Sequence, residues 1–106
     1  PSETVTDEPA KQRKKLERGE VYVEVYNNTG ISGLAGRVGG TASDVGWQVV
    51  GTDNWYGTVP STTVYYPDRL KRAAKVLARD LGVERTAPAE GEMKLDRLTL
   101  ILTGEL

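Results

Sequence analysis

Carboxylates are the main side chains with which this sequence could do acid–base chemistry, because it contains neither histidine nor cysteine. Zinc sites built on Cys or His, cysteine nucleophiles, Ser-His-Asp triads and haem ligation by His or Cys are therefore excluded. Catalysis by a carboxylate pair would need two such groups on one face beside a nucleophile. The carboxylates considered, Glu24, Asp44, Asp53 and Asp96, are scattered along the chain. We therefore expect a protein that is not an enzyme and that uses no metal and no cofactor.

The segment 53–56 is the best candidate for a binding surface. It lies in a stretch rich in turn-forming residues, yet it carries two adjacent aromatic side chains. Trp55 and Tyr56 could stack on a sugar ring or on an apolar side chain of a partner, while Asp53 and Asn54 supply hydrogen bonds. The same aromatic side chains could instead be plugs that fill the core. The sequence leaves both interpretations open.

A second candidate lies where a predicted strand turns into a predicted helix. Its residues are Asn27, Asn28, Thr29, Gly30 and Gly33. Glycines at a strand-to-helix turn resemble a phosphate loop, since N–H groups at a helix N-terminus attract anions. The Rossmann spacing and the Walker lysine are both absent. Turn geometry and close packing are therefore the favoured explanation, and contact with a ligand is the alternative.

The periodicity of the apolar residues places these candidates in a β-α-β-β-α-β order. Strict alternation over 21–26 predicts a half-buried strand, and apolar spacings of three, four and seven over 32–45 predict an amphipathic helix. Further strands are expected at 47–52, 62–66 and 98–103. A second helix is expected to start at the N-cap Asp68 and to end at Gly82. Its outer face is basic, with Arg69, Lys71, Arg72, Lys75 and Arg79. That face is a solvated surface or, alternatively, a contact for an anionic polymer or for lipid headgroups.

This order predicts an α+β fold, a two-layer sandwich in which two helices cover one face of a four-stranded mixed sheet. A ferredoxin-like arrangement fits best, because the loop 53–61 is too short for a parallel crossover and favours antiparallel pairing of the second and third strands. The alternative is a mixed sheet with helices on both faces. The alternation within the strands argues against it, since doubly covered strands read as continuous apolar runs.

Composition predicts one domain preceded by a linker. Residues 1–20 carry five acidic and five basic side chains with little to bury, which is typical of a flexible tether. Residues 21–106 form the domain. The formal net charge of −1 argues against a dedicated polyanion-binding protein. On the outward sheet face we expect Tyr22, Glu24, Tyr26, Thr63 and Tyr65. This face resembles the base-stacking surface of RNA-recognition domains, but Glu24 lies within it, so we expect no nucleic-acid partner.

Two separated motifs resemble the LytR C-terminal domain family. The first is Val23-Glu24-Val25-Tyr26-Asn27-Asn28-Thr29-Gly30, followed by Gly33-Leu34-Ala35. The second is Thr62-Thr63-Val64-Tyr65-Tyr66, and Gly46-Trp47-Gln48-Val49 between them matches a strand start of the family. The resemblance covers roughly residues 20–104. Asn28 stands where glycine is usual, and the Gly39-Gly40 pair departs from the pattern within the helix.

The resemblance implies a non-catalytic domain of the bacterial cell envelope. Its implied partners are glycopolymer ligases of the LytR-CpsA-Psr type, whose activity it would scaffold or regulate, with effects on wall remodelling, envelope integrity and vesicle release. Its implied location is the outer face of the plasma membrane, held by an N-terminal membrane anchor absent from this sequence. Alternatives are a direct peptidoglycan- or glycan-binding module and, more remotely, a nucleic-acid-binding module.

Overall fold

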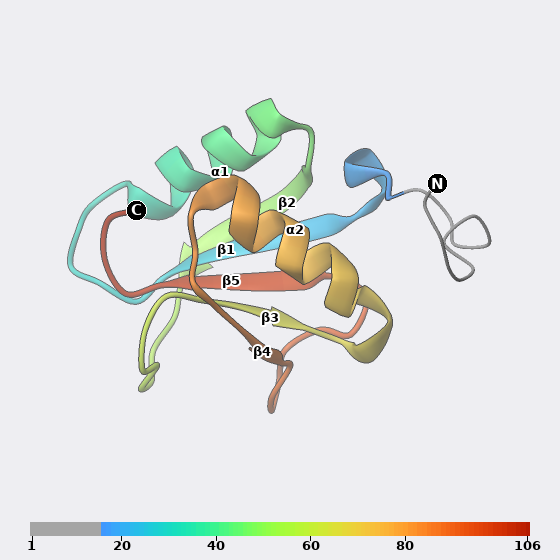
Figure 1. The fold of residues 1–106 in the computed structure, drawn as a ribbon. Coiled ribbons are helices and arrows are strands. Elements are labelled where there is room, and N and C mark those ends of the chain that lie inside the picture. Colours follow the sequence, from blue (N-terminus) through green and yellow to red (C-terminus); the bar gives the residue numbers. More distant parts are fainter. Residues whose placement is uncertain (1–15) are drawn as a thin grey trace.

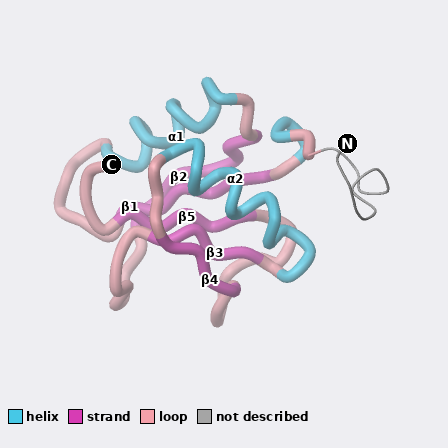
Figure 2. Tube along the Cα trace, in the orientation of Figure 1, coloured by secondary structure: helices cyan, strands magenta, loops and turns pink. Residues whose placement is uncertain are grey.

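A computed structural model describes residues 16–106, so most of the expected linker lies outside the described residues. Its two layers are a five-stranded sheet and a pair of helices on one face of that sheet (Figures 1 and 2). Helix α1 (Leu34–Val45) lies over β1 and β2, and helix α2 (Lys71–Leu81) lies over β3 and β4. The expected α+β class, mixed sheet and two main helices are thus confirmed, and the alternative with helices on both faces is wrong.

The sheet has one strand more than expected. Its strands are β1 (Tyr22–Asn27), β2 (Gln48–Asn54), β3 (Thr63–Tyr66), β4 (Arg85–Pro88) and β5 (Leu98–Leu102), in the order β2-β1-β5-β3-β4. β1 is parallel to both β2 and β5, whereas β3 is antiparallel to β5 and parallel to β4. β4 lies between the second predicted helix and the last predicted strand, where no strand was expected. It is four residues long and ends in proline, so it is too short to show a strand periodicity.

The expected antiparallel pairing of the second and third strands is wrong. β2 is at one edge of the sheet, and β1 and β5 separate it from β3. Neighbouring strands are about 4.8 Å apart, so the connection crosses roughly 15 Å. The loop 55–62 is long enough, since an extended chain spans about 3.4 Å per residue. The short loop required β2 and β3 to run in opposite directions, which they do, but it did not require them to be neighbours. The sheet therefore differs from a ferredoxin-like sheet in its strand pairing.

The main core lies between the sheet and the helices. Val23 and Val25 are completely buried there, as their alternation predicts. α1 packs closely on β2 at Gly39, where an added Cβ would lie 3.3 Å from Cγ2 of Thr52. The helix can approach the strand this closely because glycine has no side chain.

The helix ends agree with the sequence in part. Gly46 and Gly82 follow the last residues of α1 and α2 with positive φ, as expected of C-terminal caps. Asp68 was expected as an N-cap, and this is wrong. It starts a short 3-10 helix, η3 (Asp68–Leu70), and its side chain makes no capping hydrogen bond.

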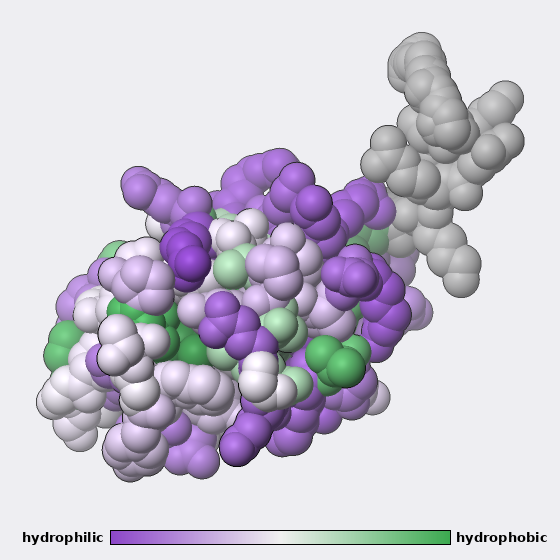
Figure 3. All heavy atoms as spheres, turned by 90° about the horizontal axis from the view of Figure 1, so that it is seen from below, coloured by the Kyte–Doolittle hydropathy of each residue, from purple (hydrophilic) through white to green (hydrophobic). Residues whose placement is uncertain are grey.

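The second face of the sheet carries a smaller core. Leu98, Leu100 and Leu102 of β5 alternate and face the helices, but Ile101 is also completely buried. It packs on the other face in a second cluster with Tyr65, Ala87 and Met93. Seen from this side, the surface shows small apolar areas interrupted by hydrophilic side chains (Figure 3).

This second cluster changes the expected outward face. Thr63 and Tyr65 were expected to be exposed there, and this is wrong, because they are 0% and 3% exposed. Segments on either side of β3 and β4 fold over them. The aromatic platform that would have resembled an RNA-binding surface is therefore absent from the described residues.

The start of the described chain is attached to the domain. Leu16 packs against the main core, and a short 3-10 helix, η2 (Arg18–Glu20), leads into β1. The Arg18 guanidinium donates to both oxygens of Asp80, at 2.8 and 3.2 Å, and lies 5.7 Å from the Trp47 ring centroid. Trp47 Nε1 donates to the same carboxylate at 2.8 Å. These contacts join the entry of the chain to α2 and to the start of β2.

Candidate functional site

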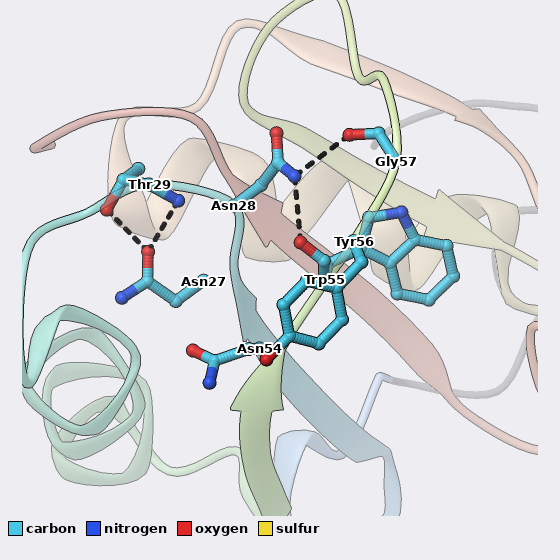
Figure 4. A pocket seen from close by; sticks show the side chains of 7 residues that line it. All are labelled: Asn27, Asn28, Thr29, Asn54, Trp55, Tyr56 and Gly57. Carbon is cyan, nitrogen blue, oxygen red and sulfur yellow. Dashed lines mark hydrogen bonds between the residues drawn. The ribbon is translucent and has the colours of Figure 1, made fainter.

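The two candidate segments of the sequence meet in one pocket. It has a volume of about 520 Å³ and is lined by Asn27, Asn28, Thr29, Asn54, Trp55, Tyr56 and Gly57 (Figure 4). β1 and β2 are parallel and in register at their last residues, so their carboxyl ends deliver both segments to the same edge of the sheet. Of the expected site residues, Asp53, Gly30 and Gly33 do not line the pocket.

Asn27 builds the turn on one side of the pocket. Its Oδ1 accepts hydrogen bonds from the backbone N–H and the hydroxyl of Thr29, and its Nδ2 donates to the Ile31 carbonyl at 2.8 Å. The Thr29 hydroxyl also accepts from the Ile31 N–H. Asn27 is 8% exposed, so its amide is committed to the turn rather than to a ligand. Gly33, with φ of 77°, ends the same turn before α1.

Asn28 fixes the opposite side of the pocket. Its Nδ2 donates to the carbonyls of Trp55, at 2.8 Å, and Gly57, at 3.0 Å. The Trp55 N–H donates to the Asn27 carbonyl at 2.9 Å, which adds a backbone link between the two segments. Asn28 is one of the two places at which the sequence departs from the motifs that it resembles. A glycine there could not make these hydrogen bonds. In this chain, the Asn28 side chain therefore holds the turn against residues 55–57, which we call the aromatic loop.

The two adjacent aromatics have different environments. Trp55 is half-buried against the second cluster, and its ring meets that of Tyr26 edge to face. Tyr56 is 85% exposed beside the pocket. The sequence left open whether the pair is a plug or a platform, and the structure assigns one residue to each environment.

The pocket keeps several polar groups available. The Tyr56 hydroxyl, the Asn54 side-chain amide and Oδ1 of Asn28 form no hydrogen bond with any residue among 16–106. Asp53 lies next to them on β2, where its Oδ1 accepts from the Asn54 N–H at 2.8 Å. An exposed ring beside unpaired amides offers both a stacking surface and hydrogen bonds to a polar ligand.

The lining contains no carboxylate and no basic side chain. Tyr56 is its only ionisable residue. Tyr26 lies behind Trp55, and its burial together with a hydrogen bond to Glu24 raises its pKa to about 12. Such a phenol stays protonated at neutral pH and cannot act as a base. The pocket is therefore suited to binding, and its described residues offer no proton-transfer pair.

An ion cluster on the outer sheet face escaped the sequence analysis. Lys94 and Arg97 both donate to Oε2 of Glu24 at 3.1 Å, and the Tyr26 hydroxyl donates to Oε1. Burial opposes ionisation of Glu24, but the hydrogen bonds from Lys94 and Tyr26 outweigh it and lower its pKa. Seventy or more residues separate Glu24 from its two cations, so no local pattern could have shown this cluster. It holds the segment before β5 against β1.

Residues 16–106 contain neither a cluster suited to a metal ion nor a helix that could cross a membrane. No group of three or more carboxylates is placed to hold a metal ion. No helix there is both long and apolar enough to cross a membrane.

Comparison with known proteins gives the family. The model described as "LytR cell envelope-related transcriptional attenuator" matches residues 20–105. Among solved structures, the soluble domain (residues 71–217) of a conserved hypothetical secreted protein of Mycobacterium marinum, an Rv2700 ortholog, superposes with a TM-score of 0.65 at 21% identity, over 81% of this chain and 60% of that one. The solution structure of the C-terminal domain of RV0431 superposes with a TM-score of 0.59 at 26% identity, over 98% of this chain and 88% of that one.

These comparisons agree with the motifs identified in the sequence. A comparison with curated proteins finds no match. The first structure shares the fold, and this chain spans only 60% of its length. The family match covers nearly all of the residues that the structure describes. The chain therefore belongs to the LytR C-terminal domain family, a family related to the bacterial cell envelope.

Proposed function

We propose that this chain is a non-catalytic recognition domain of the cell envelope that scaffolds or regulates the enzymes joining glycopolymers to peptidoglycan. Through them it would influence wall remodelling, envelope integrity and vesicle release. Family membership supports the envelope setting. The pocket supports recognition rather than catalysis, because its lining has an exposed ring and free amides but no carboxylate. Its place would be the outer face of the plasma membrane, held by a membrane tether ahead of the domain.

The observation that carries the proposal is the exposed Tyr56 at the rim of a preformed polar pocket. An 85% exposed aromatic ring has no role in the cores of the domain. The groups behind it are held by Asn28 and Trp55, so the recognition surface is preorganised. The same features favour a second candidate, direct binding of a peptidoglycan or other glycan strand, because sugar rings stack on aromatic faces and their hydroxyls pair with amides.

One experiment separates these two functions. The domain is sedimented with purified, protein-free cell wall, and in parallel it is used to capture purified ligases of the LytR-CpsA-Psr type. The test variant is Tyr56→Ala. The matched control is Tyr22→Ala, which removes a tyrosine that is 42% exposed at the other end of β1.

Ligase capture that Tyr56→Ala abolishes, without wall sedimentation, would support scaffolding. Wall sedimentation that Tyr56→Ala abolishes and Tyr22→Ala preserves would support direct glycan binding. If the wild-type domain binds neither, the proposed function is wrong. If Tyr56→Ala binds as well as the wild type, the pocket is not the site.

A further inference from the structure

The charges of this domain are strongly segregated. Residues 69–79 carry five basic and no acidic side chains. The other described residues carry five basic and twelve acidic side chains. The formal net charge of −1 for the whole chain therefore conceals a local excess of +5 over eleven residues.

Most of this excess lies on one side of α2, which we call the basic face and define as Lys71, Arg72, Lys75 and Arg79. At 100° per residue, these four positions fall within an arc of about 100°. The buried positions Ala73, Ala74, Leu77 and Ala78 lie on the opposite side of the helix. All four residues of the basic face are exposed, on the layer of the molecule that faces away from the sheet (Figure 1).

Three of the four side chains of this face make no ion pair within the described residues. Lys71, Lys75 and Arg79 form no salt bridge with any carboxylate of residues 16–106. The one carboxylate within α2, Asp80, is already paired with Arg18 and hydrogen-bonded to Trp47. The side chains of Lys71, Lys75 and Arg79 thus remain available for an external anion.

Their spacing favours a linear anion. Lys71, Lys75 and Arg79 are four residues apart, so successive charges lie roughly 6 Å apart along the helix axis. A chain with repeated phosphates can contact several of them at once, and each contact releases a counterion. Arginine adds bidentate hydrogen bonds to phosphate oxygens.

A membrane surface fits this face less well. Amphipathic helices that lie on bilayers insert large apolar side chains beside their basic ones. None of the large hydrophobic residues exposed in the described part of the chain belongs to α2. The face also lacks aromatic side chains, so it offers no stacking platform for nucleic-acid bases.

We propose that the basic face of α2 docks a linear phosphodiester polymer that carries no nucleobases, such as a polyol phosphate. This site shares no residue with the pocket at the ends of β1 and β2. A test of polymer binding by the basic face can therefore fail or succeed whatever the outcome for the function proposed for Tyr56.

Fluorescently labelled poly(glycerol phosphate) is the probe, titrated with the chain at several salt concentrations. The test variant is Lys71→Gln/Lys75→Gln. The control is Arg37→Gln/Lys94→Gln, which has the same net charge but loses two cations that belong to other segments than α2 and are paired with Glu105 and Glu24. Glutamine and lysine have similar helix propensities, so α2 should remain folded.

Three contacts, from Lys71, Lys75 and Arg79, predict a slope of log affinity against log salt of about −2, and the one contact left without both lysines predicts about −0.7. We expect the first value for the wild type and the control, and the second for the test variant. Circular dichroism confirms that each variant is folded. The Tyr56→Ala variant should bind this polymer as the wild type does.

Absence of binding at low salt would overturn the proposal. So would equal slopes for the test variant and the control, which would indicate a response to net charge alone. Tighter α2-dependent binding to phosphatidylglycerol vesicles or to a thymidine oligonucleotide would also overturn it, because the occupant would then be a membrane or a nucleic acid.

Discussion

The rings of Tyr26 and Trp55 meet edge to face, with their centroids 5.3 Å apart and their planes at 74°. This contact anchors the aromatic loop on the second core at the end of β1. The next residue, Tyr56, is left in solvent at the rim of the pocket. Anchoring and recognition therefore belong to consecutive residues, and experiments on this loop must distinguish loss of stability from loss of binding.

Trp55→Ala should destabilise the domain, whereas Tyr56→Ala should not. The first change removes the edge-to-face contact and packing against the second cluster, and we expect a loss of about 2–3 kcal/mol, less than for a fully buried tryptophan. The second change is at an exposed position and should stay within about 0.5 kcal/mol. Urea denaturation followed by circular dichroism measures both. Equal stabilities for the two variants would contradict the assignment of Trp55 as an anchor.

Asn28→Ala should loosen the loop. It removes both hydrogen bonds that join the turn to the carbonyls of Trp55 and Gly57, each worth about 1 kcal/mol. We expect faster chymotrypsin cleavage after Tyr56, together with a loss of stability of about 1–2 kcal/mol. Asn54→Ala is the control, because the Asn54 side chain forms no hydrogen bond in the described part of the chain. Similar cleavage rates for both variants would show that Asn28 does not hold the loop.

The phenol of Tyr26 should ionise late. Its pKa is raised to about 12 by burial and by the hydrogen bond to Glu24. An unfolded tyrosine titrates near 10, so the stabilisation is present below about pH 10 and is lost as the pH rises toward about 12. An alkaline titration followed by tyrosinate absorbance should show a late-titrating tyrosine whose signal disappears in Tyr26→Phe. In Glu24→Gln this group should titrate earlier, because the neighbouring negative charge is gone.

Asp80 should contribute stability that acid removes. The hydrogen bond from Arg18, reinforced by that from Trp47, holds the pKa of this carboxyl below its ordinary value. The stabilisation is therefore complete above the unfolded pKa near 3.9 and is lost as the pH falls through the lower folded value. Asp80→Asn can still accept from Trp47 Nε1, so it isolates the ion pair. Its midpoint in urea at pH 7 should fall, and the acid limb of its stability profile should be shallower than that of the wild type.

The glycines of α1 should respond differently to alanine. An added Cβ at Gly40 meets nothing within 4 Å, so Gly40→Ala should stabilise the domain by about 1 kcal/mol through helix propensity. At Gly39 the same atom would lie 3.3 Å from Thr52 Cγ2 and 3.5 Å from Val49 Cγ1. Gly39→Ala should therefore gain less or lose stability. Thermal unfolding of the two variants compares them, and a larger gain at Gly39 would contradict the close packing of α1 on β2.

Local patterns predicted the elements well, because each depends on neighbours in the sequence. The alternation over 21–26 and the apolar spacing over 32–45 were sufficient for β1 and nearly sufficient for α1. The predicted helix starts two residues before α1 does, at residue 32 rather than at Leu34. Gly33 has a left-handed backbone conformation, which the spacing of apolar residues cannot indicate.

Long-range relationships were not predictable in this way. The sequence contains no signal that β2 lies three positions from β3 in the sheet. A loop of this length and composition could connect two neighbouring antiparallel strands or two strands that lie further apart. The second cluster was missed for a related reason. Ile101 occupies a position that alternation assigns to solvent, and only the folded loops show that it is covered. The sequence identified both segments that line the pocket, but it did not predict that they lie side by side. Their proximity follows from the parallel register of β1 and β2.

The attachment of η2 has a practical consequence for presenting the domain on a sensor surface. The Arg18–Asp80 pair fixes where the chain enters, and β1 then runs away from that point to the pocket (Figure 1). The six residues of β1 span about 20 Å. A biotin or affinity handle placed ahead of residue 16 would therefore hold the domain by its far end. Tyr56 would face the flowing analyte, and immobilisation would leave the recognition edge unobstructed.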